Sequence, residues 1–232
     1  MYLVEILISM EDLVKMFLDG KLDGKVYKTG TTTVAIKCKD GVVLGADTRV
    51  TAGYYIAHKH GKKIHMITPY IAITIAGVVA DAQAIINIMR YNVSLYEIRL
   101  GKRMNAKSAA RLLSLILFSN RLFPYITELI IAGRDADGFN IYRLDPWGSL
   151  IKDNIVATGS GSTVAIGLLE SEYSENLTIE SGKDLVVKAL LAAIKRDVAS
   201  GDDIDVAVID ERGYRELTKE EKKSIIEKFG AI

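Results

Sequence analysis

The sequence has little cysteine and almost no net charge. Cys38 is the only cysteine among 232 residues, so no disulfide can form within the chain, and such thiol usage suits a reducing compartment. Cys38 lies in a strand-like pattern, where a buried thiol acts as a small hydrophobic group and not as a nucleophile. With 30 basic and 29 acidic residues, the chain offers no electrostatic basis for binding nucleic acid or an anionic membrane.

The sequence also lacks a long uninterrupted apolar run. Its most membrane-like stretch, residues 70–86, contains Gly77, Asp81 and Gln83 and is more typical of a strand followed by a helix. Near the N-terminus, Glu5 interrupts the apolar residues and no basic region precedes them, unlike a signal peptide. We therefore expect a cytoplasmic protein without membrane association. Its length and 49% hydrophobic content suffice for one domain with a substantial core, or for two small ones.

The order of periodic segments predicts an α+β protein with strands in three groups. Alternating and β-branched runs bounded by turn residues predict strands, whereas residues 51–60 look irregular. The predicted strands are residues 32–38, 42–47, 63–67, 71–76, 129–133, 139–144, 151–157 and 204–209, with a short one after Gly213. We expect the three strands between residues 129 and 157 to form a meander.

Helical spacing of apolar residues predicts two pairs of helices between these groups, over residues 79–100, 106–122, 162–173 and 179–198. Asn105 is a good N-cap for the second of them. The fourth is apolar nearly all round, which predicts that it is covered on both sides. Thr218 with Glu221 forms the capping-box pattern of a terminal helix.

One stretch carries the strongest hint of chemistry: Gly30 followed by Thr31, Thr32 and Thr33 at the start of a strand. Three threonines in a row are ordinary in a strand. However, a threonine at a chain N-terminus carries its own base, the α-amine, and can act as a nucleophile. Asp47 lies 16 residues after Thr31 and closes an apolar run. Its carboxylate is either a half-exposed strand end or a paired group inside a site. Lys63 lies 32 residues after Thr31 and, alone, is typical of a solvated turn.

Two further groups suggest other chemistry. Gly159, Ser160, Gly161 and Ser162 lie at a predicted strand-to-helix junction, as phosphate-binding loops do, but the third glycine and the lysine of the nucleotide motifs are missing. His58, His60 and His65 could suggest a metal site, yet no carboxylate or cysteine lies at ligand spacing among them. We therefore expect no metal or cofactor.

Taken together, these motifs resemble those of proteasome β-subunits, most closely the archaeal ones. The matching pieces are Gly30-Thr31-Thr32-Thr33-Val34, Gly45-Ala46-Asp47-Thr48-Arg49, Gly61-Lys62-Lys63, Ile75-Ala76-Gly77, the Ala157–Ser162 loop and Lys195-Arg196-Asp197, and the resemblance runs from Gly30 to about residue 217. It implies a four-layer αββα sandwich, the fold of N-terminal-nucleophile hydrolases, with two antiparallel sheets between helix layers. Residues 1–30 would be a propeptide removed by autolysis between Gly30 and Thr31, and residues 31–232 the hydrolase domain.

The resemblance also implies a role for individual residues. Thr31 would be the nucleophile, with Asp47 and Lys63 as a charged pair and the Gly77 N–H group stabilising the oxyanion. The residues implied to orient the nucleophile are Ser160, Asp197 and Ser200, and those implied to line the pocket for the side chain before the cut are Val50, Ile75 and Val79.

The implied activity is hydrolysis of unfolded polypeptides by a threonine-type endopeptidase. The implied partners are other β-subunits in a seven-membered ring, flanking α-subunits and an ATPase that delivers substrate. Two alternatives remain open: a catalytically silent, structural ring subunit, and another N-terminal-nucleophile amidohydrolase that acts on a small amide.

Overall fold

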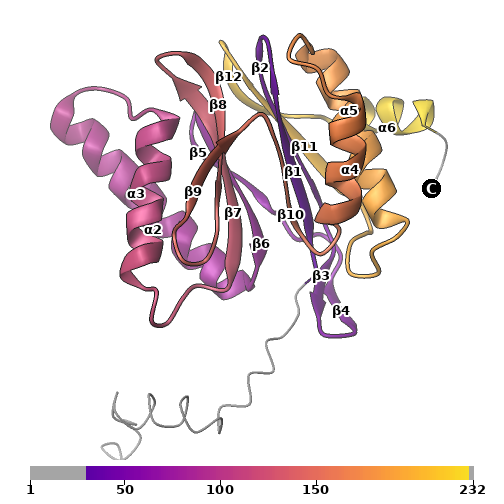
Figure 1. The fold of residues 1–232 in the computed structure, drawn as a ribbon, viewed down its shortest axis with the longest axis horizontal. Coiled ribbons are helices and arrows are strands. Elements are labelled where there is room, and N and C mark those ends of the chain that lie inside the picture. Colours follow the sequence, from indigo (N-terminus) through magenta and orange to yellow (C-terminus); the bar gives the residue numbers. More distant parts are fainter. Residues whose placement is uncertain (1–29, 230–232) are drawn as a thin grey trace, which may run out of the picture.

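A computed structural model describes residues 30–229 (Figure 1). All of the expected propeptide except Gly30 lies outside these residues. The described chain contains two five-stranded sheets, in which every neighbouring pair of strands is antiparallel. The predicted pair of antiparallel sheets is confirmed.

The first sheet has the strand order β10-β1-β2-β11-β12 and the second the order β5-β6-β7-β8-β9. Strands β3 and β4 form a separate hairpin at one end of the sheets (Figure 1). The bounds are β1 Thr32–Cys38, β2 Gly41–Asp47, β3 Val50–Ala52, β4 Tyr55–His58, β5 Ile64–Thr68, β6 Ile71–Gly77, β7 Thr127–Asp135, β8 Gly138–Leu144, β9 Leu150–Asp153, β10 Ile155–Gly159, β11 Ile204–Asp210 and β12 Gly213–Glu216.

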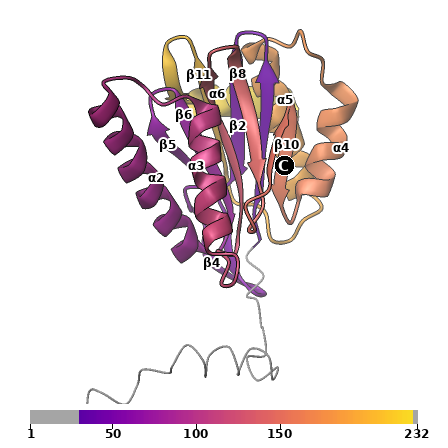
Figure 2. The same ribbon diagram turned by 60° about the vertical axis from the view of Figure 1, so that its left-hand side comes forward.

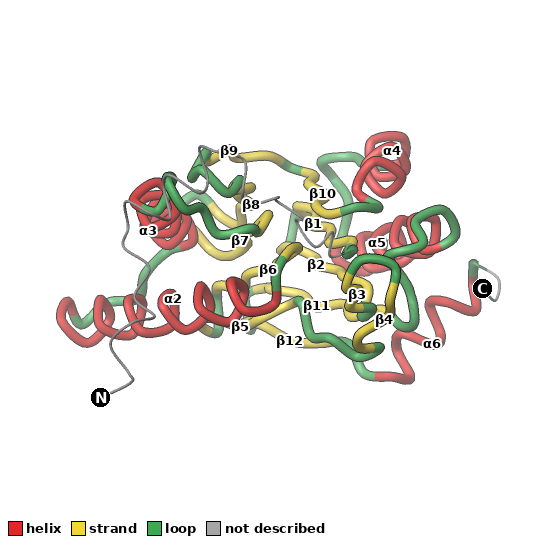
Figure 3. The backbone as a smooth tube through the Cα atoms, turned by 90° about the horizontal axis from the view of Figure 1, so that it is seen from below, coloured by secondary structure: helices red, strands yellow, loops and turns green. Residues whose placement is uncertain are grey.

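Helices cover the outer faces of both sheets (Figures 2 and 3). On the second sheet lie α2 (Val79–Leu100) and α3 (Ala106–Ser119); on the first lie α4 (Ser162–Glu172), α5 (Ile179–Ile194) and α6 (Lys219–Lys228). The arrangement is the α+β sandwich of four layers that the sequence analysis expected. Asn105 caps α3 by accepting a hydrogen bond from Ser108 N–H, and Thr218 with Glu221 forms the complete capping box of α6.

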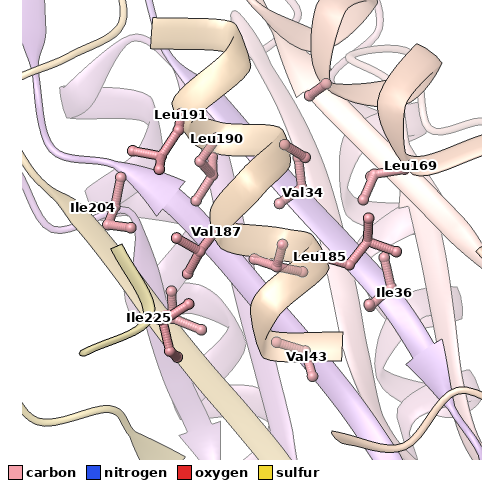
Figure 4. Close-up of a cluster of buried hydrophobic side chains, with 14 of the residues drawn as sticks. Val34, Ile36, Val43, Leu169, Leu185, Val187, Leu190, Leu191, Ile204 and Ile225 are labelled. Atoms are coloured by element: carbon pink, nitrogen blue, oxygen red, sulfur yellow. The ribbon is translucent and has the colours of Figure 1, made fainter. Parts of the chain in front are cut away.

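Three hydrophobic clusters hold these layers together. Between the sheets, fully buried side chains such as Leu44 and Ile130 face one another. Full burial of one such side chain stabilises the fold by about 1.5–3 kcal/mol. Outside the first sheet, α5 lies across β1, β2 and β11 and is also packed against α4 and α6. Figure 4 shows Val187 of α5 on the side of Ile204 and Ile225, and Leu185 on the side of Ile36 and Leu169. This helix is therefore covered on more than one side, as its composition predicts.

Three expectations about secondary structure were wrong. Residues 151–157 are not one strand: β9 belongs to the second sheet and β10 to the first, because the chain bends at Asn154 and crosses between the layers. Residues 51–60 are not irregular throughout, since they contain the β3–β4 hairpin. Helices α3 and α5 end at Ser119 and Ile194, respectively three and four residues before the predicted ends.

No helix within residues 30–229 combines the length and the apolar composition needed to cross a membrane.

Candidate active site

Thr31 lies immediately before β1, at the end of the sandwich that carries the β3–β4 hairpin (Figure 1). It is 4% exposed. Its hydroxyl donates a hydrogen bond to the carbonyl oxygen of Gly30 over 2.6 Å, and its N–H donates to Ser160 Oγ over 3.2 Å. The Thr31 hydroxyl is therefore held in direct contact with the peptide group that precedes it.

The Asp47 carboxylate, at the end of β2, is completely buried and accepts four hydrogen bonds. Oδ1 accepts from Thr32 N–H over 2.8 Å and from Lys63 Nζ over 2.7 Å. Oδ2 accepts from Arg49 N–H over 3.1 Å and from Gly201 N–H over 3.0 Å. Asp47 thereby ties the residue after Thr31 to Lys63 and to the loop before β11, which shows that it is a paired group in a buried site.

Lys63 precedes β5 and is 6% exposed. Its Nζ donates to Asp47 Oδ1 and, over 2.6 Å, to the carbonyl oxygen of Arg49. Burial lowers the pKa of Lys63 from its ordinary value, while the negative charge of Asp47 opposes that shift. Within residues 30–229, no hydrogen bond joins Lys63 Nζ to Thr31 Oγ1.

Hydrogen bonds through two serine hydroxyl groups connect the start of β1 to the Asp197 carboxylate. Asp197 Oδ2 accepts hydrogen bonds from Ser160 Oγ over 2.5 Å and from Ser200 Oγ over 2.6 Å. Ser200 Oγ is in turn 2.7 Å from Thr32 Oγ1. Thr31 and Thr32 are thus each connected to Asp197 through one serine.

Comparison with known proteins identifies the family of the chain. The "Proteasome subunit" family matches residues 27–209, which is most of the chain. The chain belongs to the proteasome subunit family. It is 47% identical over 198 residues to "Proteasome subunit beta 2" of Nitrosopumilus maritimus, covering 85% of this chain and 94% of that relative. It is also 47% identical over 208 residues to "Proteasome subunit beta" of Archaeoglobus profundus (89% and 96% covered), and 44% identical over 205 residues to that of Methanosarcina barkeri (88% and 97%).

The structure explains the two glycines of the loop between β10 and α4. A Cβ atom at Gly159 would overlap the Thr31 carbonyl oxygen, and one at Gly161 would overlap Thr32 Oγ1. Gly159 also has φ of +88°, a conformation that L side chains rarely adopt. The two glycines are therefore required for close approach to the threonines, and not for a phosphate group.

Of the expected oxyanion and pocket residues, Ile75 and Gly77 lie on β6, whereas Val50 lies on β3 and Val79 on α2. Gly77 ends β6 with φ of +138°, and Ile75 N–H donates to the Lys63 carbonyl oxygen over 3.1 Å, which places the end of β6 beside the lysine. Val50 lies at the start of β3. Val79, the first residue of α2, is 46% exposed. None of Gly77, Val50 or Val79 makes a hydrogen bond with Thr31 in the described part of the chain.

The three histidines do not form a metal site. His58 and His60 lie edge to face, with ring centroids 6.1 Å apart, whereas His65 Nε2 contacts the Lys62 carbonyl oxygen over 3.1 Å. No group of three or more possible metal ligands occurs among residues 30–229.

Sequence reasoning overlooked three polar contributors to the site. The Arg49 carbonyl oxygen accepts from Lys63, the Thr32 hydroxyl contacts Ser200, and the Thr51 hydroxyl accepts a hydrogen bond from Gly30 N–H over 2.7 Å. Arg49 and Thr32 fall inside the quoted motifs, which was the available signal. Thr51 has no such signal, because threonine is common in strands.

Proposed function

We propose that this chain is a proteolytic subunit of a proteasome core, with Thr31 as an N-terminal nucleophile after removal of residues 1–30. One observation carries the proposal. The buried Thr31 hydroxyl lies 2.6 Å from the carbonyl oxygen of Gly30, the residue before the proposed scissile bond, and close to the buried Asp47–Lys63 pair. A silent subunit has no need to bury a charged pair beside a threonine, because burying ions costs several kcal/mol per ion.

The first reaction is self-cleavage. Thr31 Oγ1 attacks the carbonyl carbon of Gly30, the C–N bond between Gly30 and Thr31 breaks, and the Gly30 acyl group is transferred to the hydroxyl oxygen as an ester. The hydroxyl proton leaves to a water molecule, and the amine nitrogen takes up a proton. Water then hydrolyses the ester, which releases residues 1–30 and frees the α-amine of Thr31.

Peptide hydrolysis follows from the same geometry. An α-amine has an unperturbed pKa of about 7.7–8.0, so at neutral pH it can accept the Thr31 hydroxyl proton, directly or through a water. The positive charge of Lys63, held by Asp47, favours the deprotonated hydroxyl and the neutral amine. Ser160, Asp197 and Ser200 orient the nucleophile through the hydrogen-bond chain described above. The Gly77 N–H group stabilises the oxyanion, a donor typically worth about 3 kcal/mol. No metal or cofactor takes part.

Relatives named proteasome subunit beta support assembly of this chain into a ring with other β-subunits. Flanking α-subunits, an ATPase that feeds in unfolded protein and a cytoplasmic location complete the proposal. Native mass spectrometry of the chain co-expressed with an α-subunit should show a complex of several hundred kilodaltons. A stable monomer under those conditions would contradict the assembly.

A peptidase assay separates the proposal from its two alternatives. The purified assembly is incubated with fluorogenic peptides and with small amides, alongside Thr31→Ala protein. Peptide turnover that disappears in Thr31→Ala supports the threonine peptidase. No turnover by either protein indicates a structural subunit, and turnover of small amides alone indicates another amidohydrolase.

A further inference from the structure

The residue before the scissile bond is held by more than the nucleophile. Gly30 is buried, and its N–H group donates to Thr51 Oγ1 over 2.7 Å. Its carbonyl oxygen accepts from Thr31 Oγ1. A Cβ atom at residue 30 would overlap Ala199 Cβ, so the glycine lies directly against the loop that precedes β11. Both the N–H group and the carbonyl oxygen of Gly30 therefore have a side-chain partner, and its Cα atom packs against Ala199.

Thr51 is well suited to fix that residue. It is the central residue of β3, is 5% exposed, and lies between neighbours that are more exposed. As a β-branched side chain in a strand, it has few accessible rotamers, so its hydroxyl oxygen has a defined position. Strand β3 follows directly from Asp47 and Arg49, which bind Lys63. The Gly30 amide is thus attached to the same segment that holds the charged pair.

The conformation of Gly30 decides whether attack is possible. Glycine populates a wider range of φ and ψ than any other residue, so a free Gly30 would turn its carbonyl carbon toward Thr31 Oγ1 only part of the time. Hydrogen bonds at both the N–H group and the carbonyl oxygen hold the two ends of Gly30, and together they restrict rotation about both of its backbone bonds. Reactions of this kind depend on holding the attacking oxygen and the carbonyl carbon in near-attack geometry.

We propose that Thr51 is a positioning residue for self-cleavage, and that its hydroxyl holds the Gly30 amide so that the Gly30 carbonyl faces the Thr31 hydroxyl. Thr51 does not touch the reacting atoms; it acts through the backbone of Gly30. The inference rests on the self-cleavage proposed above and adds the residue that aligns the scissile bond.

The test measures the rate at which residues 1–30 are lost. Full-length chain is mixed with purified α-subunits, and intact mass is followed over time for wild type, Thr51→Val and Thr51→Ser. Thr51→Val removes the acceptor and keeps the volume, so cleavage should slow at least about fivefold, which corresponds to about 1 kcal/mol in the barrier. Thr51→Ser retains the hydroxyl and should stay within about twofold of wild type.

Thr74→Val is the matched control. Thr74 is a fully buried threonine on β6 whose hydroxyl hydrogen-bonds with Thr33 Oγ1 over 3.0 Å, so the change removes a buried hydrogen bond that does not involve Gly30. It should cleave within about twofold of wild type. If Thr51→Val does not assemble, Thr51→Ala replaces it with the same expected slowing.

The outcomes divide cleanly. Wild-type cleavage speed in Thr51→Val overturns the inference, as does a Thr51→Ser variant as slow as Thr51→Val, because then the hydroxyl is not responsible. Equal slowing in Thr74→Val would also overturn it, since general destabilisation would explain the effect. In all three cases the proposed function stands, provided that wild type is cleaved and Thr31→Ala is not. If wild type keeps residues 1–30, the proposed function and this inference both fail.

Discussion

Replacing Asp47 by Asn tests the buried charged pair most severely. The carboxylate accepts four hydrogen bonds, two on each oxygen, and all four partners are donors. An asparagine amide has one oxygen and one NH₂ group. Whichever way it turns, its NH₂ group faces two donors: either Lys63 Nζ and Thr32 N–H, or Arg49 N–H and Gly201 N–H.

The size of the effect follows from burial. Asp47 is 0% exposed and Lys63 is 6% exposed. Removing one partner of a buried pair typically costs about 3–5 kcal/mol, because the other charge is left uncompensated. Lys63 can relieve part of this by losing its proton, since burial already lowers its pKa. Deprotonation, however, removes the charge that the proposed reaction uses. We therefore expect peptidase activity and self-cleavage each to fall at least about 100-fold, or about 2.7 kcal/mol in the barrier.

The assay combines intact mass for cleavage, fluorogenic peptides for turnover and thermal unfolding for stability. Asp202→Asn is the matched control, because it makes the same chemical change in the same region. The Asp202 carboxylate pairs with Arg49 Nε over 2.9 Å and lies nearer the surface than Asp47. Such a pair is worth about 1 kcal/mol or less, and Asn tolerates the positive φ of 68° at this position. Asp47→Asn protein that remains within about threefold of wild type in both reactions would refute the role given to the pair.

Three further predictions concern other parts of the chain. Lys63→Arg keeps the positive charge but changes the shape of the side chain, so self-cleavage and peptide turnover should fall below about a tenth of wild type, a barrier change of about 1.4 kcal/mol, while assembly survives. Higher activity would show that Lys63 does not tune the pKa values of the Thr31 groups. Because Val50, Ile75 and Val79 are aliphatic, peptides with large apolar residues before the cut should react faster than peptides with Glu there, and the reverse order would contradict this pocket. Burial raises the pKa of Cys38 to about 12, so the folded protein should resist alkylation at pH 8 and the denatured protein should not, as labelling followed by mass analysis can check.

The fold was predictable wherever local signals are strong. Helix α2 has the predicted bounds, residues 79–100, because apolar spacing defines it and Gly101 ends it with φ of +61°. The division of residues 151–157 between β9 and β10 was not predictable. The strand-like pattern continues through Asp153 and Asn154, and membership of a sheet depends on pairing with β1 and β8, which are distant in the sequence.

The site was predictable only as far as its motifs extend. Thr31, Asp47 and Lys63 were singled out by the resemblance, and the structure brings Asp47 and Lys63 into contact one residue away from Thr31. The contact between Thr51 and Gly30 could not be inferred, because it depends on how the hairpin folds back on the start of β1. The same holds for Gly201, whose backbone N–H binds Asp47 across 154 positions of sequence.

The central claim is that the α-amine of Thr31, and not another group, is the base in peptide hydrolysis. While the bond between Gly30 and Thr31 is intact, the Thr31 nitrogen is an amide and cannot accept a proton. Its N–H group donates to Ser160 instead. The measurement is turnover of a fluorogenic peptide by two forms of the chain, each identified by intact mass: the full 232 residues, and residues 31–232. We predict that the full-length form is inert and that activity appears in step with release of residues 1–30. Equal turnover by both forms would contradict the account.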